Sequence, residues 1–317
     1  MELTYGDVKT ASDRISGYVR PVALAPGDAV PTTGSGPCEL WLALEFMQHT
    51  GSFKARGARN FIQAHRDDGT LSDAGVTIAS GGNAGLACAW AARGQGVRAT
   101  VFLPTTAPTV KVERLRGYGA DVRLVGTEYA EALAACREYA HSSGALLSHA
   151  YDNPCIASGA GTLMMEIHRQ LPRLDTVVVA VGGGGLFAGI ATAAHHYGVR
   201  TIAVEPENCR ALHAAIQAGT IVDAPVDSVA ADSLGARRAT ELALYAAQNY
   251  DVTSVLVPDE DIIATRQALW HDRRLAVEHA AATALAALTT STYRPEPGER
   301  VCVVLCGANT DPSDLAR

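Results

Sequence analysis

A run of four glycines, at residues 182–185, constrains the fold of this chain more than any other feature of the sequence. The run follows an apolar segment, 177–181, and precedes a segment typical of a helix, 186–196. Four residues without a Cβ atom allow the backbone to wrap closely around a bound group. A strand that leads through such a loop into a helix N-terminus directs unpaired N–H groups toward one point, which attracts an anion, most often a phosphate. The sequence therefore predicts a site for a phosphorylated small molecule.

The composition of the 317-residue chain narrows the classes of function. It is 48% hydrophobic and 19% charged, which is typical of a globular protein, and its length allows two lobes. The net charge of −7, without a run of Lys or Arg, argues against nucleic-acid binding. The polar N-terminus is unlike a secretory signal, and the uncharged stretch 176–194 is better explained as strand, loop and helix than as a membrane span. Seven scattered cysteines indicate reduced thiols and a cytoplasmic location.

Short β-rich segments alternate with alanine-rich helical segments along almost the whole chain. We expect strands at 39–44, 76–79, 99–103, 121–125, 176–181, 201–205, 254–257 and 300–305. We expect helices between them, among others at 84–93, 110–117, 128–141, 185–197 and 259–270. The alternation predicts an α/β fold of two lobes, each an open and mostly parallel sheet flanked by helices. We place residues 1–74 and 151–317 in a large domain and residues 75–150 in a small inserted α/β domain.

The glycine loop alone also fits a dinucleotide-binding fingerprint. Gly183, Gly185 and Ala188 match G-x-G-x-x-A, and Glu205 ends the next predicted strand, where an acid that binds a ribose would lie. This alternative predicts a nicotinamide or flavin enzyme. It gives no role to two other unusual segments.

The first of these segments, 50–58, places Lys54 after small polar residues and one aromatic. Most lysines are surface charges, but in a desolvated site the amine loses its proton more easily and can form a Schiff base. The second segment, 80–85, is either an ordinary loop with Asn83 as a helix N-cap or a second anion site, whose backbone N–H groups grip a carboxylate. A lysine with cradles for a phosphate and a carboxylate indicates pyridoxal phosphate acting on an amino acid.

The same segments carry a resemblance that extends over nearly the whole chain. The shared motifs are at residues 51–58, 80–85, 103–106, 111–113, 182–186, 204–206, 277–278 and 304–309. With them the chain resembles the fold type II pyridoxal-phosphate enzymes and, among these, the serine/threonine dehydratases. Only the set of motifs together makes the resemblance specific.

The resemblance implies a role for each residue of the cofactor site. Lys54 would hold the cofactor covalently and then act as the base at the substrate Cα. Phe53 would stack on the pyridine ring, and Asn83 would bond its 3-hydroxyl oxygen. Cys306 would face the pyridine nitrogen; without the resemblance, a buried cysteine at a strand end is the simpler interpretation. The phosphate would be bound by N–H groups of Gly182, Gly183, Gly184, Gly185 and Leu186.

For the substrate, the resemblance implies a carboxylate site at Ser80, Gly81 and Ala84. The implied reaction is α,β-elimination from a β-hydroxy amino acid such as L-threonine or L-serine, which yields a 2-oxo acid and ammonia. Serine racemases have a serine as second base where this chain has Gly81, which cannot move a proton. A β-replacement reaction, or elimination from a specialised substrate such as 3-hydroxyaspartate, remains an alternative.

Relatives of this kind often bind a cation through an acid at the position of Glu205. Those that hold a divalent ion add an acid six residues later, where this chain has Ala211, so the resemblance favours a monovalent ion such as potassium. The alternative is that Glu205 is a surface acid at a strand end. The resemblance also implies a homodimer. Because the sequence ends at Arg317, we expect no additional C-terminal regulatory domain.

Overall fold

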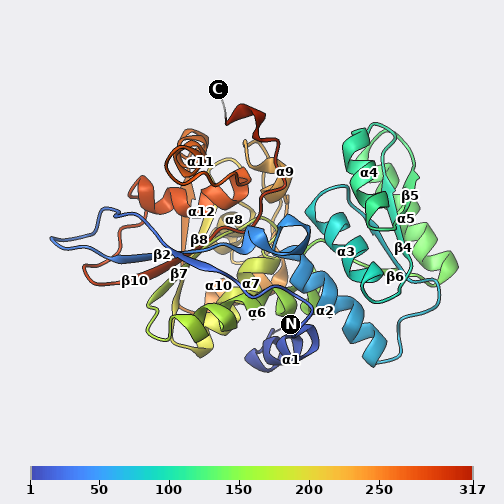
Figure 1. Ribbon diagram of the computed structural model, residues 1–317, viewed down its shortest axis with the longest axis horizontal. Coiled ribbons are helices and arrows are strands. Elements are labelled where there is room, and N and C mark those ends of the chain that lie inside the picture. The colour runs from blue at the N-terminus through green and yellow to red at the C-terminus, as the bar shows by residue number, and fades with distance from the viewer. Residues whose placement is uncertain (1, 316–317) are drawn as a thin grey trace.

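Two separate β-sheets form the frame of the molecule (Figure 1). The computed structural model describes residues 2–315, so Met1 and residues 316–317 of the predicted large domain lie outside the described part. The strands are β1 (Leu24–Pro26), β2 (Glu39–Ala43), β3 (Val76–Ala79), β4 (Ala99–Leu103), β5 (Asp121–Leu124), β6 (Leu146–Leu147), β7 (Thr176–Ala180), β8 (Arg200–Pro206), β9 (Val252–Val257) and β10 (Arg300–Val304).

The larger sheet has six strands in the order β1-β2-β10-β7-β8-β9. All neighbours are parallel except β1, which runs antiparallel to β2. In its centre Cys302 of β10 pairs with Trp41 of β2 on one side and with Val177 of β7 on the other. Every residue of β7 is buried, as expected of a parallel strand with helices on both faces of its sheet.

Helices cover both faces of the larger sheet. In Figure 1, α12 and α11 lie on one side of it, whereas α7, α10 and α6 lie on the other, with α1 outside α6. The helices are α1 (Tyr5–Ile15), α2 (Lys54–Asp67), α3 (Asn83–Arg93), α4 (Thr109–Gly117), α5 (Tyr129–Ser143), α6 (Pro154–Gln170), α7 (Gly185–His196), α8 (Ala211–Ala218), α9 (Ala231–Leu234), α10 (Glu241–Asn249), α11 (Asp259–Arg273) and α12 (His279–Thr289), with 3₁₀ turns η1 (Glu45–Met47), η2 (His49–Gly51) and η3 (Pro312–Asp314).

The smaller sheet has four parallel strands in the order β5-β4-β3-β6. Helices α3, α4 and α5 follow its strands along the chain, and together they form the unit on the right of Figure 1. Its core also includes Phe61 and Ile62 of α2, which precedes the sheet in sequence. Helix α2 therefore contacts both units, and the domain boundaries at 74/75 and 150/151 stay a prediction.

Glycine pairs set the spacing of the helices behind the site. A Cβ on Gly159 of α6 would lie 2.7 Å from the Cα of Gly57 in α2, and one on Gly161 would lie 2.6 Å from the carbonyl oxygen of Gly189 in α7. Only residues without a Cβ allow three helices to cross so closely. As a result, α2, which begins at Lys54, has a fixed position relative to α7, which follows the glycine run.

The structure confirms the predicted α/β fold with two mostly parallel sheets. All eight predicted strands are present within two residues of their expected limits, but β1 and β6 were not expected. The strand β10 ends at Val304, so Cys306 lies in the loop beyond it and not on the strand. Among the described residues 2–315, no helix has the length and hydropathy needed to cross a bilayer.

Candidate active site

A strained turn places Lys54 at the start of α2. Thr50 and Gly51 in η2 both adopt the left-handed conformation, with φ of 63° and 76°. A β-branched residue in this region costs about 1–2 kcal/mol, so neighbouring contacts must hold it. They come from the loop after β10: the amide group of Asn309 donates to the Thr50 carbonyl (2.7 Å), and the Ala308 N–H donates to the Gly51 carbonyl (2.9 Å). The turn therefore joins the carboxyl ends of β2 and β10.

The amine of Lys54 lies in a desolvated position. Its Nζ is 4.5 Å from the centre of the Phe53 ring and 3.4 Å from the carbonyl oxygen of Ala150. Burial lowers the pKa of Lys54 below its ordinary value, and the nearby Glu278 opposes this shift only in part. A larger fraction of the amine is therefore neutral, as a nucleophile or a base at carbon requires.

Cys306 lies beside Lys54 because two backbone segments pair there. The Phe53 N–H donates to the Cys306 carbonyl (3.0 Å), and Ser52 forms an isolated antiparallel bridge with Gly307. Burial raises the pKa of the Cys306 thiol to about 12, and Glu278 adds to the increase. The side chain is therefore a neutral thiol at neutral pH. The buried hydroxyl of Ser52 has no hydrogen-bond partner among residues 2–315, which leaves a polar atom free next to the lysine.

The glycine loop presents a row of free donors at the carboxyl end of β7. None of the backbone N–H groups of residues 182–186 donates to an acceptor within the described part of the chain. Gly184 has a φ of 97°, and it forms the N-cap of α7 without a side-chain cap. Unpaired amides at a helix N-terminus favour an anion. The loop therefore has the geometry of the predicted phosphate cradle.

A second cradle lies at the carboxyl end of β3. The amides of Gly81, Asn83 and Ala84 likewise have no acceptor among residues 2–315, while the Gly82 N–H donates to the Ser80 hydroxyl at 3.4 Å. A Cβ on Gly85 would lie 1.8 Å from the Ser80 carbonyl oxygen, so the loop requires glycine at that position. Helix α3 begins at Asn83 with Gly82 as its N-cap, which excludes the interpretation of Asn83 as a capping residue.

The side chain of Asn83 instead takes part in a polar cluster with Glu278 and Asn309. Its Nδ2 donates to both carboxylate oxygens of Glu278 (2.8 and 3.0 Å), and its Oδ1 accepts from Nδ2 of Asn309 (2.6 Å). The Asn309 N–H donates to Glu278 Oε1 (2.8 Å), and the Ser233 hydroxyl donates to Glu278 Oε2 (2.9 Å). The buried Glu278 thus connects segments that lie far apart in the sequence.

The same cluster connects the lysine with the phosphate cradle. Leu234, next to Ser233, lies so close to the glycine loop that a Cβ on Gly182 would be 3.0 Å from its Cα. The structure therefore brings all predicted site residues except Glu205 into one connected region. Sequence reasoning assigned no role to Glu278, Asn309 or Ser233, although Glu278 and Asn309 lie in two of the shared motifs.

Glu205 lies near the carboxyl end of β8 and is not part of this polar cluster. Its side chain is fully buried, and its two oxygens accept from the Leu212 and His213 N–H groups at the start of α8, each at 2.8 Å. Burial raises the pKa of Glu205 to about 7, although these hydrogen bonds lower it. The interpretation of Glu205 as a surface acid is therefore wrong. Its enclosed carboxylate is also unavailable to a ribose, which argues against the dinucleotide alternative.

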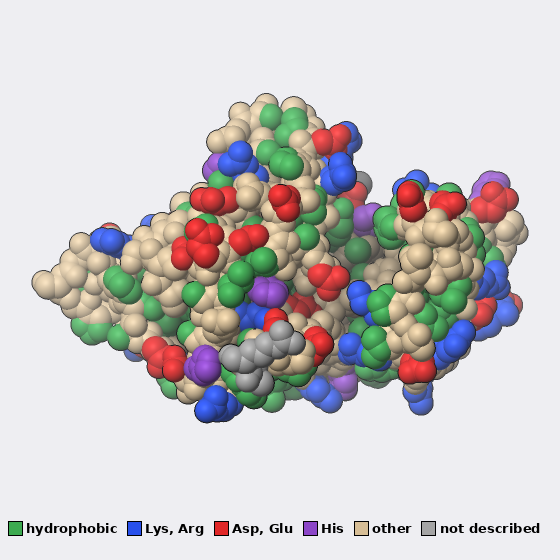
Figure 2. Space-filling view, turned by 90° about the horizontal axis from the view of Figure 1, so that it is seen from above, with side chains coloured by type: hydrophobic (Ala, Val, Ile, Leu, Met, Phe, Trp, Pro, Cys, Tyr) green, Lys and Arg blue, Asp and Glu red, His purple; other side chains and the backbone are tan. Residues whose placement is uncertain are grey.

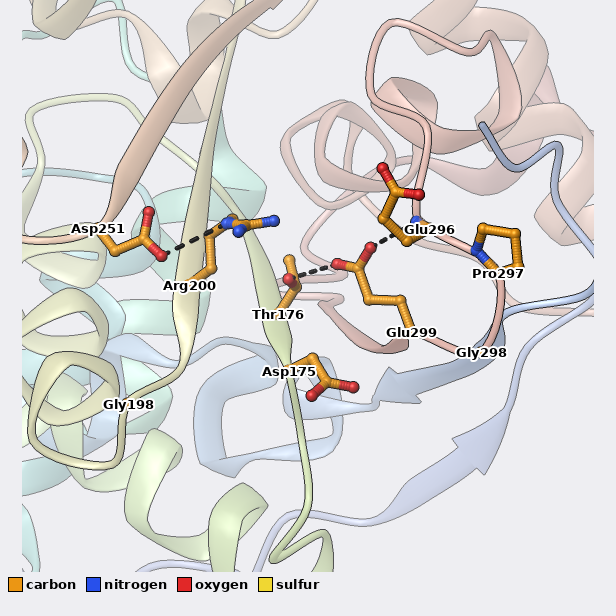
Figure 3. Close-up of a pocket in the computed structure, with 9 residues that line it drawn as sticks. All are labelled: Asp175, Thr176, Gly198, Arg200, Asp251, Glu296, Pro297, Gly298 and Glu299. Atoms are coloured by element: carbon orange, nitrogen blue, oxygen red, sulfur yellow. Dashed lines mark hydrogen bonds and ion pairs between the residues drawn. The ribbon is translucent and has the colours of Figure 1, made fainter. Parts of the chain in front are cut away.

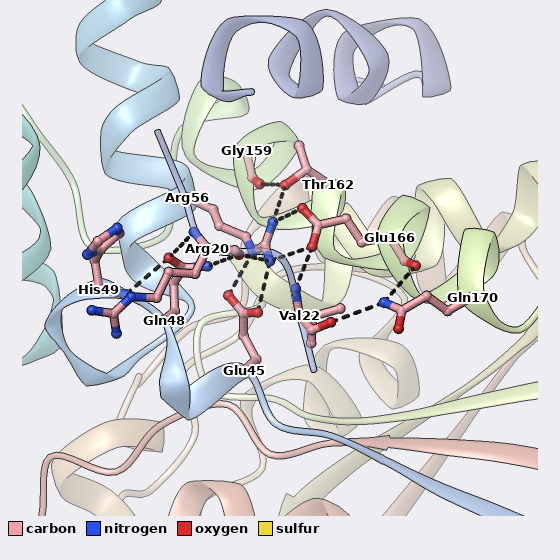
Figure 4. Close-up of polar contacts among 10 residues, drawn as sticks. All are labelled: Arg20, Val22, Glu45, Gln48, His49, Arg56, Gly159, Thr162, Glu166 and Gln170. Atoms are coloured by element: carbon pink, nitrogen blue, oxygen red, sulfur yellow. Dashed lines mark hydrogen bonds and ion pairs between the residues drawn. The ribbon is translucent and has the colours of Figure 1, made fainter. Parts of the chain in front are cut away.

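A buried ion cluster lies at the first turn of α2, close in sequence to Lys54 (Figure 4). Arg56, two residues after Lys54 and fully buried, contacts Glu45 at 2.7 and 3.0 Å and Glu166 at the same two distances. Burial lowers the pKa of Arg56, but the two carboxylates outweigh this effect and leave the pKa above its ordinary value. The cluster ties the first turn of α2 to η1 and to α6.

Open space lies next to the polar cluster. A cavity of about 480 Å³ extends from Glu278 and Asn309 between α4 and α9, with Lys111 and Arg114 on one wall and Asp232 on the other. In Figure 2 the surface is hollowed between the two units. Another pocket, of about 450 Å³, lies at the amino ends of β7 and β8, near Thr176 and Arg200 (Figure 3). It contains none of the predicted site residues.

Comparison with known families decides what the two cradles and the lysine represent. The family described as "Pyridoxal-phosphate dependent enzyme" matches residues 29–307, which include every predicted site residue. The chain belongs to this family.

Among the relatives of the chain, the L-threonine ammonia-lyase of Geobacter sulfurreducens is 36% identical over 316 residues, which cover 99% of this chain and 77% of the relative. The solved threonine deaminase isoform 2 of Solanum lycopersicum superimposes with a TM-score of 0.82 at 28% identity and covers 98% of this chain and 80% of its own. A solved pyridoxal 5'-phosphate-dependent aspartate racemase has a TM-score of 0.86 at 30% identity and covers 99% of this chain and 98% of its own. The proteins similar to this chain therefore include both lyases and racemases.

The described residues fit pyridoxal phosphate. The free amides of 182–186 would bind its phosphate, and Lys54 would hold it covalently. The neutral Cys306 thiol provides no negative charge for the pyridine nitrogen. Phe53, whose ring lies beside the lysine, is in position to contact the pyridine ring.

Replacement of Gly183 by alanine tests the phosphate cradle. The new Cβ would lie 2.2 Å from the Tyr151 ring, so either the ring or the loop must move. Overpacking of this kind costs about 1–3 kcal/mol, and we expect the Kd for pyridoxal phosphate to rise by about tenfold or more. Titration of the cofactor-free protein measures this, with Gly117→Ala as control because a Cβ there has nothing within 4 Å. Equal affinity in both variants would contradict the assigned cradle.

Proposed function

We propose that this chain catalyses pyridoxal-phosphate-dependent α,β-elimination from a β-hydroxy amino acid such as L-threonine or L-serine. The products are a 2-oxo acid and ammonia. The observation that carries the proposal is the lysine of lowered pKa next to two separate groups of unpaired backbone amides, one for a phosphate and one for a carboxylate. The ammonia-lyase and deaminase named among the relatives support the same reaction.

In this proposal the residues of the chain bind, orient and move a proton. Ser80, Gly81 and Ala84 line the site for the substrate carboxylate, which the free amides of residues 81, 83 and 84 bind. The side chain of Asn83, held by Glu278 and Asn309, orients the pyridine ring of the cofactor. When bound, pyridoxal phosphate supplies an electron-withdrawing ring that stabilises negative charge on the substrate Cα. Once the substrate amine has replaced Nζ of Lys54 on the cofactor, the freed Nζ takes the proton from Cα. The β-hydroxyl takes up a proton and leaves as water, so no net proton is gained or lost in the elimination. The released enamine becomes an imine and is hydrolysed by a second water molecule to the 2-oxo acid and ammonia.

Racemisation requires a second proton carrier on the other side of the substrate. The resemblance places that carrier at the position of Gly81, which has no side chain, so elimination is the favoured reaction despite the similar fold of the aspartate racemase. Beta-replacement and elimination from a specialised substrate such as 3-hydroxyaspartate remain the alternatives within the family.

A substrate panel tests the proposed reaction. Ammonia and 2-oxo-acid release are measured with pyridoxal phosphate present and with L-serine, L-threonine, 3-hydroxyaspartate and phenylserine as substrates. We expect equal amounts of ammonia and 2-oxo acid to be released from L-serine or from L-threonine. Release of ammonia and 2-oxo acid from 3-hydroxyaspartate alone would show that the enzyme acts on a specialised substrate. A protein that binds the cofactor but releases neither product from any substrate would overturn the proposed elimination.

We further propose that Glu205 contributes to a site for a monovalent cation such as potassium. The buried carboxylate, with a pKa of about 7, is a costly charge that a cation would offset. Backbone carbonyls would have to complete such a site, because no cluster of three or more metal-ligating side chains is found within residues 2–315.

The pH dependence of stability tests this cation site. Because the pKa of Glu205 rises from 4.5 to about 7 on folding, protonation stabilises the fold, and without a cation stability falls as pH rises through 7. A cation binds the ionised form, so K⁺ should raise Tm more at pH 8 than at pH 6. Calorimetry in KCl against choline chloride measures this. Glu205→Gln should remove the difference; an identical K⁺ effect in this variant would contradict the site.

The location of the protein, its oligomeric state and its domain boundaries are proposed from the resemblance to the family. We propose a cytoplasmic homodimer with the large and small domains divided near residues 75 and 150. The seven cysteines, all of which are free thiols in the structure, support a reducing compartment.

A further inference from the structure

Arg266 is a buried arginine that the proposed chemistry does not use. It lies on α11 with 3% of its surface exposed, and its guanidinium group contacts two separate segments, at Val277 and at residues 310–314. Nε donates to the Val277 carbonyl (2.8 Å), a terminal nitrogen donates to the Thr310 hydroxyl (3.0 Å), and both terminal nitrogens contact the Asp314 carboxylate (2.7 and 3.1 Å). The hydrogen bond from Arg266 lowers the pKa of Asp314, so this ion pair is intact at neutral pH.

Two of these contacts lie directly beside the polar cluster of the site. Val277 precedes Glu278, and Thr310 follows Asn309. Between the two segments, the Asn309 N–H donates to Glu278 Oε1 at 2.8 Å, and the Glu278 N–H donates to the Gly307 carbonyl at 3.0 Å. Arg266 thus fixes the distance between two loop segments. The neighbouring residues in these segments, Glu278 and Asn309, must lie close together to bind Asn83.

A guanidinium group suits this task because of its shape. Its planar array of five donors can bind a backbone carbonyl on one edge and a carboxylate on another, whereas a lysine ammonium acts as a point charge. Its full set of partners also explains how a charge is tolerated at this depth. Arg266 has no hydrogen bond or ion pair with Lys54, Asn83, Glu278 or Asn309.

We propose that Arg266 is a positioning residue for the site, which holds the Glu278 carboxylate and the Asn309 side chain in register with Asn83. Asp314 anchors Arg266 from the opposite side. Arg266 would hold the cluster in this way whatever the substrate of the enzyme. Arg266 acts through the backbone at residues 277 and 310 and not by contact with a reacting atom.

The experiment compares Arg266→Met with Arg273→Met, a control on the same helix. Arg273 binds the exposed Asp28 and the Pro26 carbonyl, remote from the cluster. In the cofactor-free protein, we expect hydrogen exchange at the amides of residues 278 and 309 to be about tenfold faster or more in Arg266→Met. The Kd for pyridoxal phosphate should rise about tenfold, and the pH midpoint of the absorbance of the bound cofactor should shift. Arg273→Met should leave all three within twofold.

Two further variants separate positioning from general stability. Arg266→Lys keeps the charge but not the planar fork, so we expect it to restore thermal stability more fully than it restores the pH midpoint. Asp314→Asn keeps Arg266 in place and weakens its anchor, and we expect a smaller change of about twofold to threefold in the Kd. A lower Tm for Arg266→Met with local exchange, Kd and pH midpoint all unchanged would overturn the proposal. If Arg266→Met does not fold, unchanged values in Asp314→Asn and Arg266→Lys would overturn it.

Discussion

Lys54→Ala is expected to lower the turnover number by at least about 10⁴-fold, because in the proposed reaction one side chain both holds the cofactor and takes the Cα proton. The lowered pKa of this lysine supplies the neutral amine that both roles need. Ammonia release under saturating substrate measures the loss. Treatment with borohydride should attach the reduced cofactor to the peptide that contains Lys54 in the wild-type protein and to no peptide of the variant.

A matched control for this variant is Lys9→Ala. Lys9 lies on α1, is mostly exposed and pairs with Asp13 at 3.6 Å, so its removal should change stability and turnover only slightly. Ammonia release by Lys54→Ala at a tenth or more of the wild-type rate would show that another group is the base. Borohydride labelling at Lys9 or Lys111 would identify a different attachment site.

Arg56→Ala is expected to cost about 3–5 kcal/mol of unfolding free energy, because it leaves the buried carboxylate of Glu45 and the partly buried carboxylate of Glu166 without their arginine. Burial already raises the pKa of Glu45, and Arg56 opposes this. Without Arg56 the pKa of Glu45 rises further, so protonation favours the folded variant and stability falls as pH increases. Urea unfolding should therefore show a larger deficit at pH 8 than at pH 5.

Two comparisons test the origin of this deficit. Arg123→Ala removes an exposed arginine paired with Asp121 and should cost less than about 1 kcal/mol. The double variant Arg56→Ala with Glu45→Gln should recover part of the loss, since one buried charge is absent. A deficit for Arg56→Ala that is small and independent of pH would mean that water reaches the cluster. The contribution of these charges to the placement of α2 would then be minor.

Much of the site could be predicted because its local signals are strong. A glycine run between an apolar strand and a helix has few interpretations, and the structure places the free amides of 182–186 where the pattern indicated. The alternation of strands and helices likewise predicted the two sheets. The antiparallel β1 was missed because it has three residues and ends in Pro26, which is a poor strand signal.

The remainder of the site depends on contacts between distant residues. Thr50 has a left-handed conformation in a turn whose carbonyl is bound by Asn309, 259 positions later. Glu278 and Arg266 are ordinary charged residues in sequence, and only the folded chain reveals that both are buried. A buried charge gives no local pattern when its partners come from other segments. Glu278 lies in the shared motif at 277–278, but this motif did not indicate what the residue does.

The position of β10 has a consequence for the order in which the protein can fold during synthesis. β10 begins at Arg300, yet it lies between β2 and β7, so β2 has no parallel neighbour until almost all described residues have left the ribosome. The smaller sheet uses only strands between Val76 and Leu147 and can pair much earlier. Late closure of long-range strand pairs slows folding and exposes unpaired backbone. A nascent chain halted before β10 should therefore depend on chaperones, although one of its two sheets is already complete.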